Sequence, residues 1–175
     1  MKLLVLYATT DGQTRKIARH VADGLADKGH GVELLEAREG AGLNLARFDR
    51  AILAGSLHAG GYQAALASFA RDHAAALNAM PTLFLAVSLS AAGDDAEDWA
   101  GLHKCLEAFH RDTGWTPKRI AHVAGAFRFS EYGFFRAWAM KRIAGQKDAS
   151  VDPHHDKEYT DWAALDAEVA GWLAA

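Results

Sequence analysis

Short apolar segments alternate with helix-like patterns along the whole chain, and this alternation restricts the fold more than any other feature. Five segments have the apolar character of strands, at residues 3–8, 31–37, 51–55, 82–87 and 120–126. Strands that alternate with helices form a parallel sheet with helices on both faces. We therefore predict a doubly wound α/β domain that binds its ligand at the carboxyl ends of the strands.

Apolar residues at helical spacing predict the helices between these segments. The pattern that starts at Tyr62 predicts one helix, which ends before Pro81. Gly29 is placed to end the first helix, and Thr160 or Asp161 to cap the last one. The helices thus fall where the connections of a parallel sheet require them.

Composition limits the class of protein further. The 175 residues fit one domain, half of them are apolar, and the net charge of −3 does not favour a nucleic-acid partner. Cys105 is the only cysteine; we expect it to be buried and unreactive, in a reducing compartment. No apolar run reaches the roughly 20 residues of a membrane-spanning helix, and a core strand at the N-terminus leaves no room for a signal peptide.

The loop after the first strand has the composition of a binding site for one phosphate group. Hydroxyl groups and backbone N–H groups converge there, at the positive end of the next helix dipole. The loop matches neither the dinucleotide nor the nucleoside-triphosphate fingerprint, and it contains no lysine. An ordinary turn with Thr and Asp as helix caps is the alternative. The predicted phosphate-binding residues are Thr9, Thr10, Asp11, Gly12, Gln13 and Thr14.

Two further loops at the same edge are rich in small residues, which allow backbone to approach a flat ring closely. The loop after the third strand contains Ser56, Leu57, His58, Ala59, Gly60, Gly61 and Tyr62. The loop after the fourth strand contains Ser88, Leu89, Ser90, Ala91, Ala92 and Gly93. Plain connections of small residues are the alternative. One phosphate beside a planar heterocycle describes flavin mononucleotide (FMN).

Several motifs, in matching order along nearly the whole chain, resemble those of the flavodoxin-like, quinone-dependent protoporphyrinogen oxidases. They are Thr10-Asp11-Gly12-Gln13-Thr14-Arg15, Asp49-Arg50, Ser56 with Gly60 and Tyr62, His73-Ala74, Leu77-Asn78-Ala79-Met80-Pro81, Ala124-Gly125-Ala126 with Arg128, and Tyr159-Thr160-Asp161-Trp162. One departure is His58-Ala59, where relatives tend to have a basic residue and an aromatic one. Tyr62 could then provide the aromatic cover of the flavin.

The resemblance implies a flavodoxin-like five-stranded parallel sheet of order 2-1-3-4-5, with an extra helical segment before the last helix. It implies an FMN-dependent enzyme that oxidises protoporphyrinogen IX to protoporphyrin IX in haem biosynthesis. It also implies a membrane quinone as electron acceptor. The first loop would then hold the FMN phosphate, and the other two would flank the isoalloxazine ring.

The extra segment, residues 127–150, has five basic residues against two acidic ones, interleaved with six aromatic residues. Arginine and aromatic side chains suit a flat tetrapyrrole with two carboxylates, so we predict Arg128, Arg136 and Lys141 as substrate-binding residues. The same composition suits an anionic membrane surface, and we expect a cytoplasmic protein attached peripherally to the inner face of the cell membrane. A short covering helix with a solvated basic side is the alternative.

Other readings and residues remain open from sequence alone. A flavodoxin that carries electrons between proteins is the alternative function, although such carriers are usually strongly acidic; a module without its cofactor is a third. No residue identifies itself as a general base, and a homodimer is compatible with the sequence. We expect His73 to be a packed residue and His154-His155 to lie in a polar loop without a metal ion.

Overall fold

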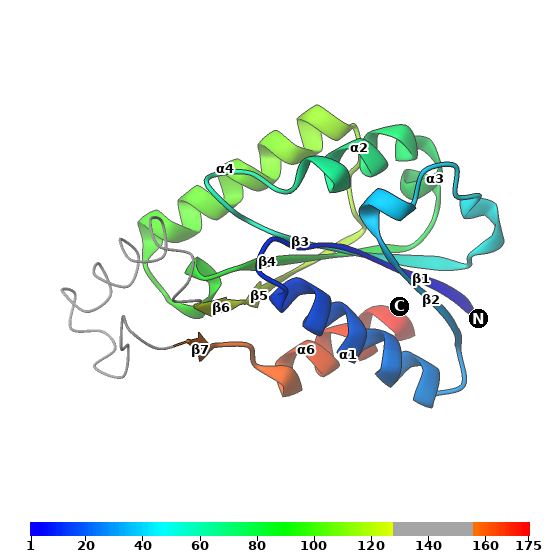
Figure 1. Cartoon of the computed structure of the whole chain (residues 1–175), viewed down its shortest axis with the longest axis horizontal. Helices are drawn as coiled ribbons and strands as arrows, with labels where there is room; N and C mark the ends of the chain where they lie inside the picture. Colours follow the sequence, from blue (N-terminus) through cyan, green and yellow to red (C-terminus); the bar gives the residue numbers. More distant parts are fainter. Residues whose placement is uncertain (128–155) are drawn as a thin grey trace.

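The computed structural model describes residues 1–127 and 156–175, which form a five-stranded parallel sheet between two layers of helices (Figure 1). The strands of this sheet are β1 (Lys2–Ala8), β2 (Gly31–Glu36), β3 (Arg50–Ser56), β4 (Thr82–Ser88) and β5 (Arg119–Ala124). The α-helices are α1 (Gln13–Asp27), α2 (Ala64–Asp72), α3 (Ala74–Ala79), α4 (Ala96–Thr113) and α6 (Trp162–Ala174). Short 3₁₀ helices are η1 (Ala37–Glu39), η2 (Leu45–Arg47) and η3 (Ser90–Ala92).

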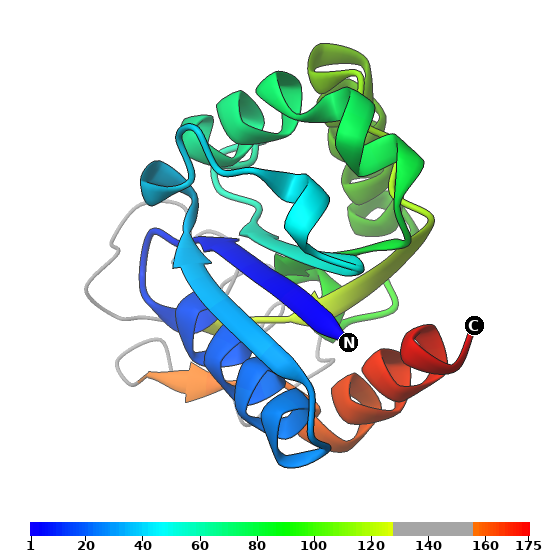
Figure 2. The same ribbon diagram turned by 90° about the vertical axis from the view of Figure 1, so that its right-hand side faces the viewer.

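The strand order is β2-β1-β3-β4-β5, and every neighbouring pair is parallel, which confirms the predicted sheet. Helices α1 and α6 cover one face, and α2, α3 and α4 cover the other (Figures 1 and 2). The order reverses between β1 and β3, so the connections after these two strands leave toward opposite faces. This reversal places the ligand-binding edge at their carboxyl ends.

Alternation along the strands divides the core into two clusters, one on each face of the sheet. On β1, Leu3 and Val5 point toward α1 and α6, whereas Leu4 and Leu6 point toward α2 and α4. All four side chains are fully buried. Strands covered on both faces need apolar residues at successive positions, which explains the continuous apolar run of residues 51–55.

Helix ends follow local chemistry. Gly29 adopts a left-handed conformation (φ 84°) just after α1, and its N–H donates to the Ala26 carbonyl at 2.8 Å. Of the two residues proposed as the cap of α6, Asp161 has this role, since its carboxylate accepts from the Ala164 N–H at 2.9 Å. Thr160 instead donates its hydroxyl hydrogen to the Ala124 carbonyl at 2.7 Å.

The single helix predicted between the third and fourth strands is wrong in two respects. Tyr62 precedes the helix, and the helix is interrupted at His73, which separates α2 from α3. The His73 ring stacks on Phe69 and places its two nitrogens 3.0 and 3.2 Å from the carbonyls of Phe69 and Leu43. His73 is therefore a packed residue, as expected, and its contacts coincide with the break.

The predicted fifth strand is too long by two residues. β5 ends at Ala124 because β4 ends at Ser88, beyond which η3 offers no strand to pair with. The chain continues as β6 (Ala126–Phe127), which pairs in antiparallel fashion with β7 (Lys157–Glu158). The predicted helical segment and the two histidines, His154 and His155, fall on residues outside the described part of the chain.

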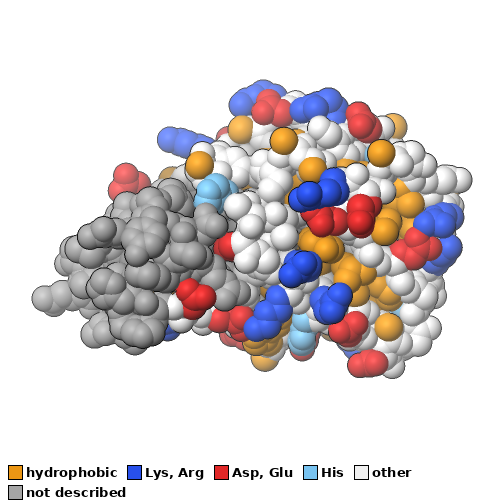
Figure 3. Space-filling model, viewed as in Figure 1, with side chains coloured by type: hydrophobic (Ala, Val, Ile, Leu, Met, Phe, Trp, Pro, Cys, Tyr) orange, Lys and Arg blue, Asp and Glu red, His pale blue; other side chains and the backbone are white. Residues whose placement is uncertain are grey.

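Residues 1–127 and 156–175 contain no helix that is long and apolar enough to cross a bilayer. Basic and acidic side chains are interspersed over the face seen in Figure 3, so this described face offers no large surface of one charge. A membrane-binding surface of the predicted basic kind would have to come from elsewhere.

Candidate cofactor site

The carboxyl ends of β1, β3, β4 and β5 enclose one pocket, as the sequence predicts for the ligand-binding edge. Residues from all three predicted loops line it, together with three residues that the sequence analysis did not select. The lining residues are Thr10, Asp11, Gln13, Thr14, Ser56, Leu57, His58, Val87, Ser88, Leu89, Gly125 and Ala126. The pocket thus brings together segments more than one hundred residues apart in the chain.

The first loop is shaped by its own side chains. Gly12 has a left-handed conformation (φ 94°), which lets the chain turn from β1 into α1. The Gly12 N–H donates to Thr9 Oγ1 at 2.9 Å, and the Gln13 N–H donates to Asp11 Oδ1 at 3.1 Å. Thr9 and Asp11 therefore fix the loop conformation from within, and Thr10, Asp11 and Thr14 line the pocket.

Thr14, in the first turn of α1, is fully buried, yet its hydroxyl has no hydrogen-bond partner among the described residues. A buried hydroxyl without a partner costs about 1–3 kcal/mol. A phosphate oxygen at the pocket would accept its hydrogen and would also lie at the positive end of the α1 dipole. The residues present therefore fit a phosphate group at this position.

Gln63, which the sequence analysis missed, joins the first loop to the second. Its amide nitrogen donates to Thr10 Oγ1 at 3.2 Å and to Ser56 Oγ, and its Oε1 accepts from the Ser56 N–H at 3.2 Å. One side chain thus holds the ends of β1 and β3 in register around the pocket.

The second loop makes a tight turn at its tip. His58 and Gly61 exchange backbone hydrogen bonds of 2.9 and 3.1 Å, while Ala59 (φ 48°) and Gly60 (φ 83°) have left-handed conformations. Cys105 of α4 donates its thiol hydrogen to the Gly60 carbonyl at 3.3 Å. The thiol is only partly buried, so the expectation of a buried cysteine is wrong. Cys105 instead contacts the tip of this turn at Gly60.

Tyr62 does not line the pocket. Its ring packs edge-on against Phe84 and Phe109, with ring centroids 5.1 Å apart in both cases. Burial, with a smaller contribution from Cys105, raises the pKa of its hydroxyl well above the usual range. The ring therefore packs against the core between β4 and α4, and its predicted cover of a flavin stays a prediction.

The third loop folds into η3 and presents only its first residues to the pocket. Ser88 Oγ accepts from the Ala91 N–H at 3.1 Å, and the Gly93 N–H donates to the Ser90 carbonyl at 3.2 Å. Ser90, Ala91, Ala92 and Gly93 lie behind Ser88 and Leu89 and do not line the pocket.

Trp99 contacts the third loop directly, and His122 packs against Trp99. Trp99 Nε1 donates to the Gly93 carbonyl at 2.8 Å, and its ring meets His122 edge-on at 5.1 Å. Burial, and secondarily the neighbouring His103, lower the pKa of His122. The sequence marks Trp99 only as an apolar position of a helix, so its support of the loop could not be predicted.

Residues 158–160 do not line the pocket, but they bind two residues that do, Gln13 and Gly125, which the sequence analysis did not predict. The Tyr159 N–H donates to the Gly125 carbonyl at 3.0 Å, which holds this segment against the end of β5. Gln13 Nε2 donates to Glu158 Oε2 and to Thr160 Oγ1, both at 3.0 Å. The C-terminal part of the chain therefore contacts the first loop directly.

The predicted substrate-binding residues Arg128, Arg136 and Lys141 lie outside the described residues, and their roles stay predictions. Within residues 1–127 and 156–175, no three His, Cys, Asp or Glu side chains gather in a way that could hold a metal ion. The described site offers hydroxyls, backbone N–H groups and small side chains. It can bind an anionic, flat ligand, and Asp11 and His58 add a carboxylate and an imidazole to its lining.

Comparisons with known proteins agree with this geometry. The sequence profile of the flavodoxin domain matches residues 4–153. The protoporphyrinogen IX dehydrogenase [quinone] of Escherichia coli (strain K12) is 30% identical over 162 residues, which are 93% of this chain and 89% of that protein. The Leishmania major protein of the same name is 30% identical over 165 residues, 94% of this chain and 71% of that protein.

Two solved structures share the fold at low sequence identity. Oxidised flavodoxin 2 from Bacillus cereus has a TM-score of 0.54 and 20% identity, and the alignment covers 71% of this chain and 85% of that one. A flavodoxin from Pseudomonas aeruginosa has a TM-score of 0.53 and 16% identity, covering 83% of this chain and 96% of that one.

Proposed function

The chain belongs to the quinone-dependent protoporphyrinogen IX dehydrogenases of the flavodoxin-domain family, and on this premise we propose that it is an FMN-dependent oxidoreductase. It oxidises protoporphyrinogen IX and passes the electrons to a quinone. The single observation that carries the cofactor assignment is the buried hydroxyl of Thr14 at the N-terminus of α1, which has no partner among residues 1–127 and 156–175.

The described residues bind and orient the cofactor. Thr10 and Thr14 face the phosphate end, and the backbone of Ser56 to His58 and of Ser88 and Leu89 lines the remainder of the pocket. When bound, FMN supplies the ability to take hydrogen from a reduced substrate and to pass electrons to an acceptor. Backbone N–H groups at the ring edge can stabilise the charge that develops during this transfer.

Steady-state turnover tests the proposal. The FMN-loaded protein is mixed with protoporphyrinogen IX under anaerobic conditions, with and without menaquinone, and porphyrin fluorescence is followed. We expect porphyrin to form continuously only when the quinone is present. If the loaded protein leaves protoporphyrinogen unchanged with every quinone offered, an electron-carrier function would replace the enzymatic one.

Attachment to the membrane surface is a finer part of the same proposal. A quinone dissolved in the bilayer requires the enzyme to approach the membrane, and the basic, aromatic composition of residues 127–150 suits an anionic lipid surface. We further propose that these residues bind both the lipid surface and the tetrapyrrole, with the protein on the cytoplasmic side.

A further inference from the structure

Residues 158–160, which we call the strap, follow the start of β7 at Lys157 and contact the carboxyl end of β5. Two hydrogen bonds hold the strap to the sheet. The Tyr159 N–H donates to the Gly125 carbonyl at 3.0 Å, and the Thr160 hydroxyl donates to the Ala124 carbonyl at 2.7 Å. The strap is therefore anchored at the pocket independently of its contacts with α1.

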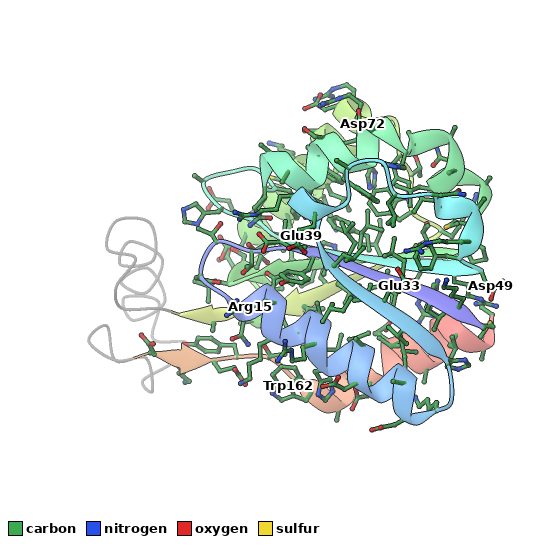
Figure 4. All side chains as sticks on the ribbon, turned by 45° about the vertical axis from the view of Figure 1, so that its right-hand side comes forward. Arg15, Glu33, Glu39, Asp49, Asp72 and Trp162 are labelled. Carbon is green, nitrogen blue, oxygen red and sulfur yellow. The ribbon has the colours of Figure 1, made fainter. Side chains whose placement is uncertain are left out.

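The carboxylate of Glu158 binds three groups from two helices. Its Oε2 accepts from Gln13 Nε2 at 3.0 Å and lies 2.6 Å from Lys16 Nζ, both on the first turns of α1. Its Oε1 accepts from Trp162 Nε1 at 3.0 Å, at the start of α6. In Figure 4, Trp162 lies below α1, and the label of Arg15 marks the N-terminal part of that helix. The hydrogen bonds lower the pKa of Glu158 despite its partial burial, so the group is charged at neutral pH.

These contacts fix the first turn of α1. Gln13 is almost fully buried, and its amide group donates to both Glu158 and Thr160. Lys16 is directed at Glu158 and at the Trp162 ring, whose centroid is 5.2 Å from Nζ. Thr14, which follows Gln13, carries the buried pocket hydroxyl that has no partner among the described residues. The position of that hydroxyl, and of the N-terminal N–H groups of α1, thus depends on the strap.

We propose that Glu158 is a positioning residue for the phosphate end of the cofactor site, acting through Gln13. The inference rests on the proposed function, since it takes the phosphate to be that of FMN. The side chain does not touch the pocket; it preorganises the groups that do. Preorganisation of this kind strengthens binding because less conformational freedom is lost when the ligand binds.

The test compares FMN with riboflavin, which has the same ring but no phosphate. The full-length chain is stripped of flavin and titrated with each ligand by flavin fluorescence. We expect Glu158→Ala to weaken FMN binding by at least about fivefold, the scale of one lost hydrogen bond, and riboflavin binding by less than about twofold. A purely structural role would weaken both ligands alike, and that outcome would overturn the proposal.

Glu168→Ala is the matched control. Glu168 is also a partly exposed glutamate in an ion pair, with Arg119 at 2.7 Å, but it lies on α6 away from the pocket. We expect this variant to keep the affinity for both flavins. An equal loss of FMN affinity in the two glutamate variants would count against a specific role for Glu158.

A double-mutant cycle shows whether Glu158 acts through Gln13. Gln13→Ala should also weaken FMN selectively, and adding Glu158→Ala to it should cause little further loss. Fully additive losses would contradict the inference. If Glu158→Ala does not fold, the comparison of FMN with riboflavin is made with Gln13→Ala alone. Failure of the FMN assignment looks different, because the wild-type chain would then bind FMN and riboflavin equally. Failure of the enzymatic function would appear in the turnover assay and would leave these binding comparisons unchanged.

Discussion

At the scale of single residues, the hydroxyl of Thr14 destabilises the flavin-free protein and is expected to bind the phosphate when FMN is present. It is buried without a partner among the described residues, so it destabilises the fold until a ligand accepts its hydrogen. We expect Thr14→Val, which keeps the shape and removes the hydroxyl, to weaken FMN binding about tenfold or more. The same variant should leave the flavin-free protein as stable as the wild type or more stable, measured by urea unfolding.

Thr82→Val is the matched control for this prediction. Thr82 is equally buried on β4, but its hydroxyl oxygen accepts from the Lys118 N–H at 3.2 Å, far from the pocket. We expect the opposite pattern: a stability loss of about 1–3 kcal/mol because the Lys118 N–H loses its partner, and no change in FMN affinity. Normal FMN binding by Thr14→Val would contradict the phosphate assignment.

Ala59 is the one described residue other than glycine with a positive φ, at 48° in the tip of the second loop. The left-handed conformation costs an L-residue roughly 1–2 kcal/mol, whereas glycine adopts it freely. We expect Ala59→Gly to stabilise the protein slightly, by up to about 1 kcal/mol, in a urea titration. Ala67→Gly, inside α2, should destabilise it by about 1 kcal/mol. A loss of stability in both variants would refute the strained turn.

The residues of the site were only partly predictable. Thr10, Thr14, Ser56 and Ser88 sit at strand ends, where a local pattern reveals them, and the structure places them in the pocket. Glu158 contacts Gln13 across 145 positions of sequence, and such a pair leaves no local signal. Side-chain contacts between distant segments require the folded chain.

At the scale of elements, the strands were predicted to within one or two residues. A continuous apolar run marks β3, and alternation around Val32 and Leu34 marks β2. The ribbon of β6 (Ala126–Phe127) and β7 (Lys157–Glu158) was missed because two-residue strands carry no periodicity. The same limitation extended the predicted fifth strand past Gly125. Helix ends with a specific cap, such as Gly29 and Asp161, were found more reliably than the break at His73.

The packing of α4 against the edge strand β5 makes stability depend on pH. Burial lowers the pKa of His110, and the nearby Glu107 partly offsets this shift. Burial also lowers the pKa of His122, and the nearby His103 lowers it further. A base with a lowered pKa in the folded state binds more protons when unfolded, so stability is full above about pH 6.5 and falls as the pH drops further.

We therefore expect the urea midpoint of the wild type to fall between pH 7.5 and pH 5.5. The double variant His110→Gln/His122→Gln should show a smaller decline over the same interval, which lies above the range where Glu158 titrates. Parallel pH profiles for the two proteins would show that these histidines are not responsible.

At the scale of the whole molecule, the described part of the face seen in Figure 3 carries basic and acidic side chains side by side. The basic residues proposed for membrane contact belong to residues 127–150. We expect the protein to float with anionic liposomes at low salt and to be released at high salt, since screening weakens each basic contact. Neutral liposomes are the control. Retention through a high-salt wash, or indifference to lipid charge, would contradict peripheral electrostatic attachment.

The central claim is that reduced tetrapyrrole passes hydrogen directly to flavin held at the carboxyl edge of the sheet. The most direct measurement is anaerobic mixing of the FMN-loaded protein with protoporphyrinogen IX in the absence of any quinone, followed by visible absorbance. The account predicts that the flavin bleaches, because each flavin takes one hydride and one proton from the tetrapyrrole. Added menaquinone should restore the flavin colour and allow the successive turnovers that complete the porphyrin. A flavin that stays oxidised with protoporphyrinogen but bleaches with dithionite would contradict it.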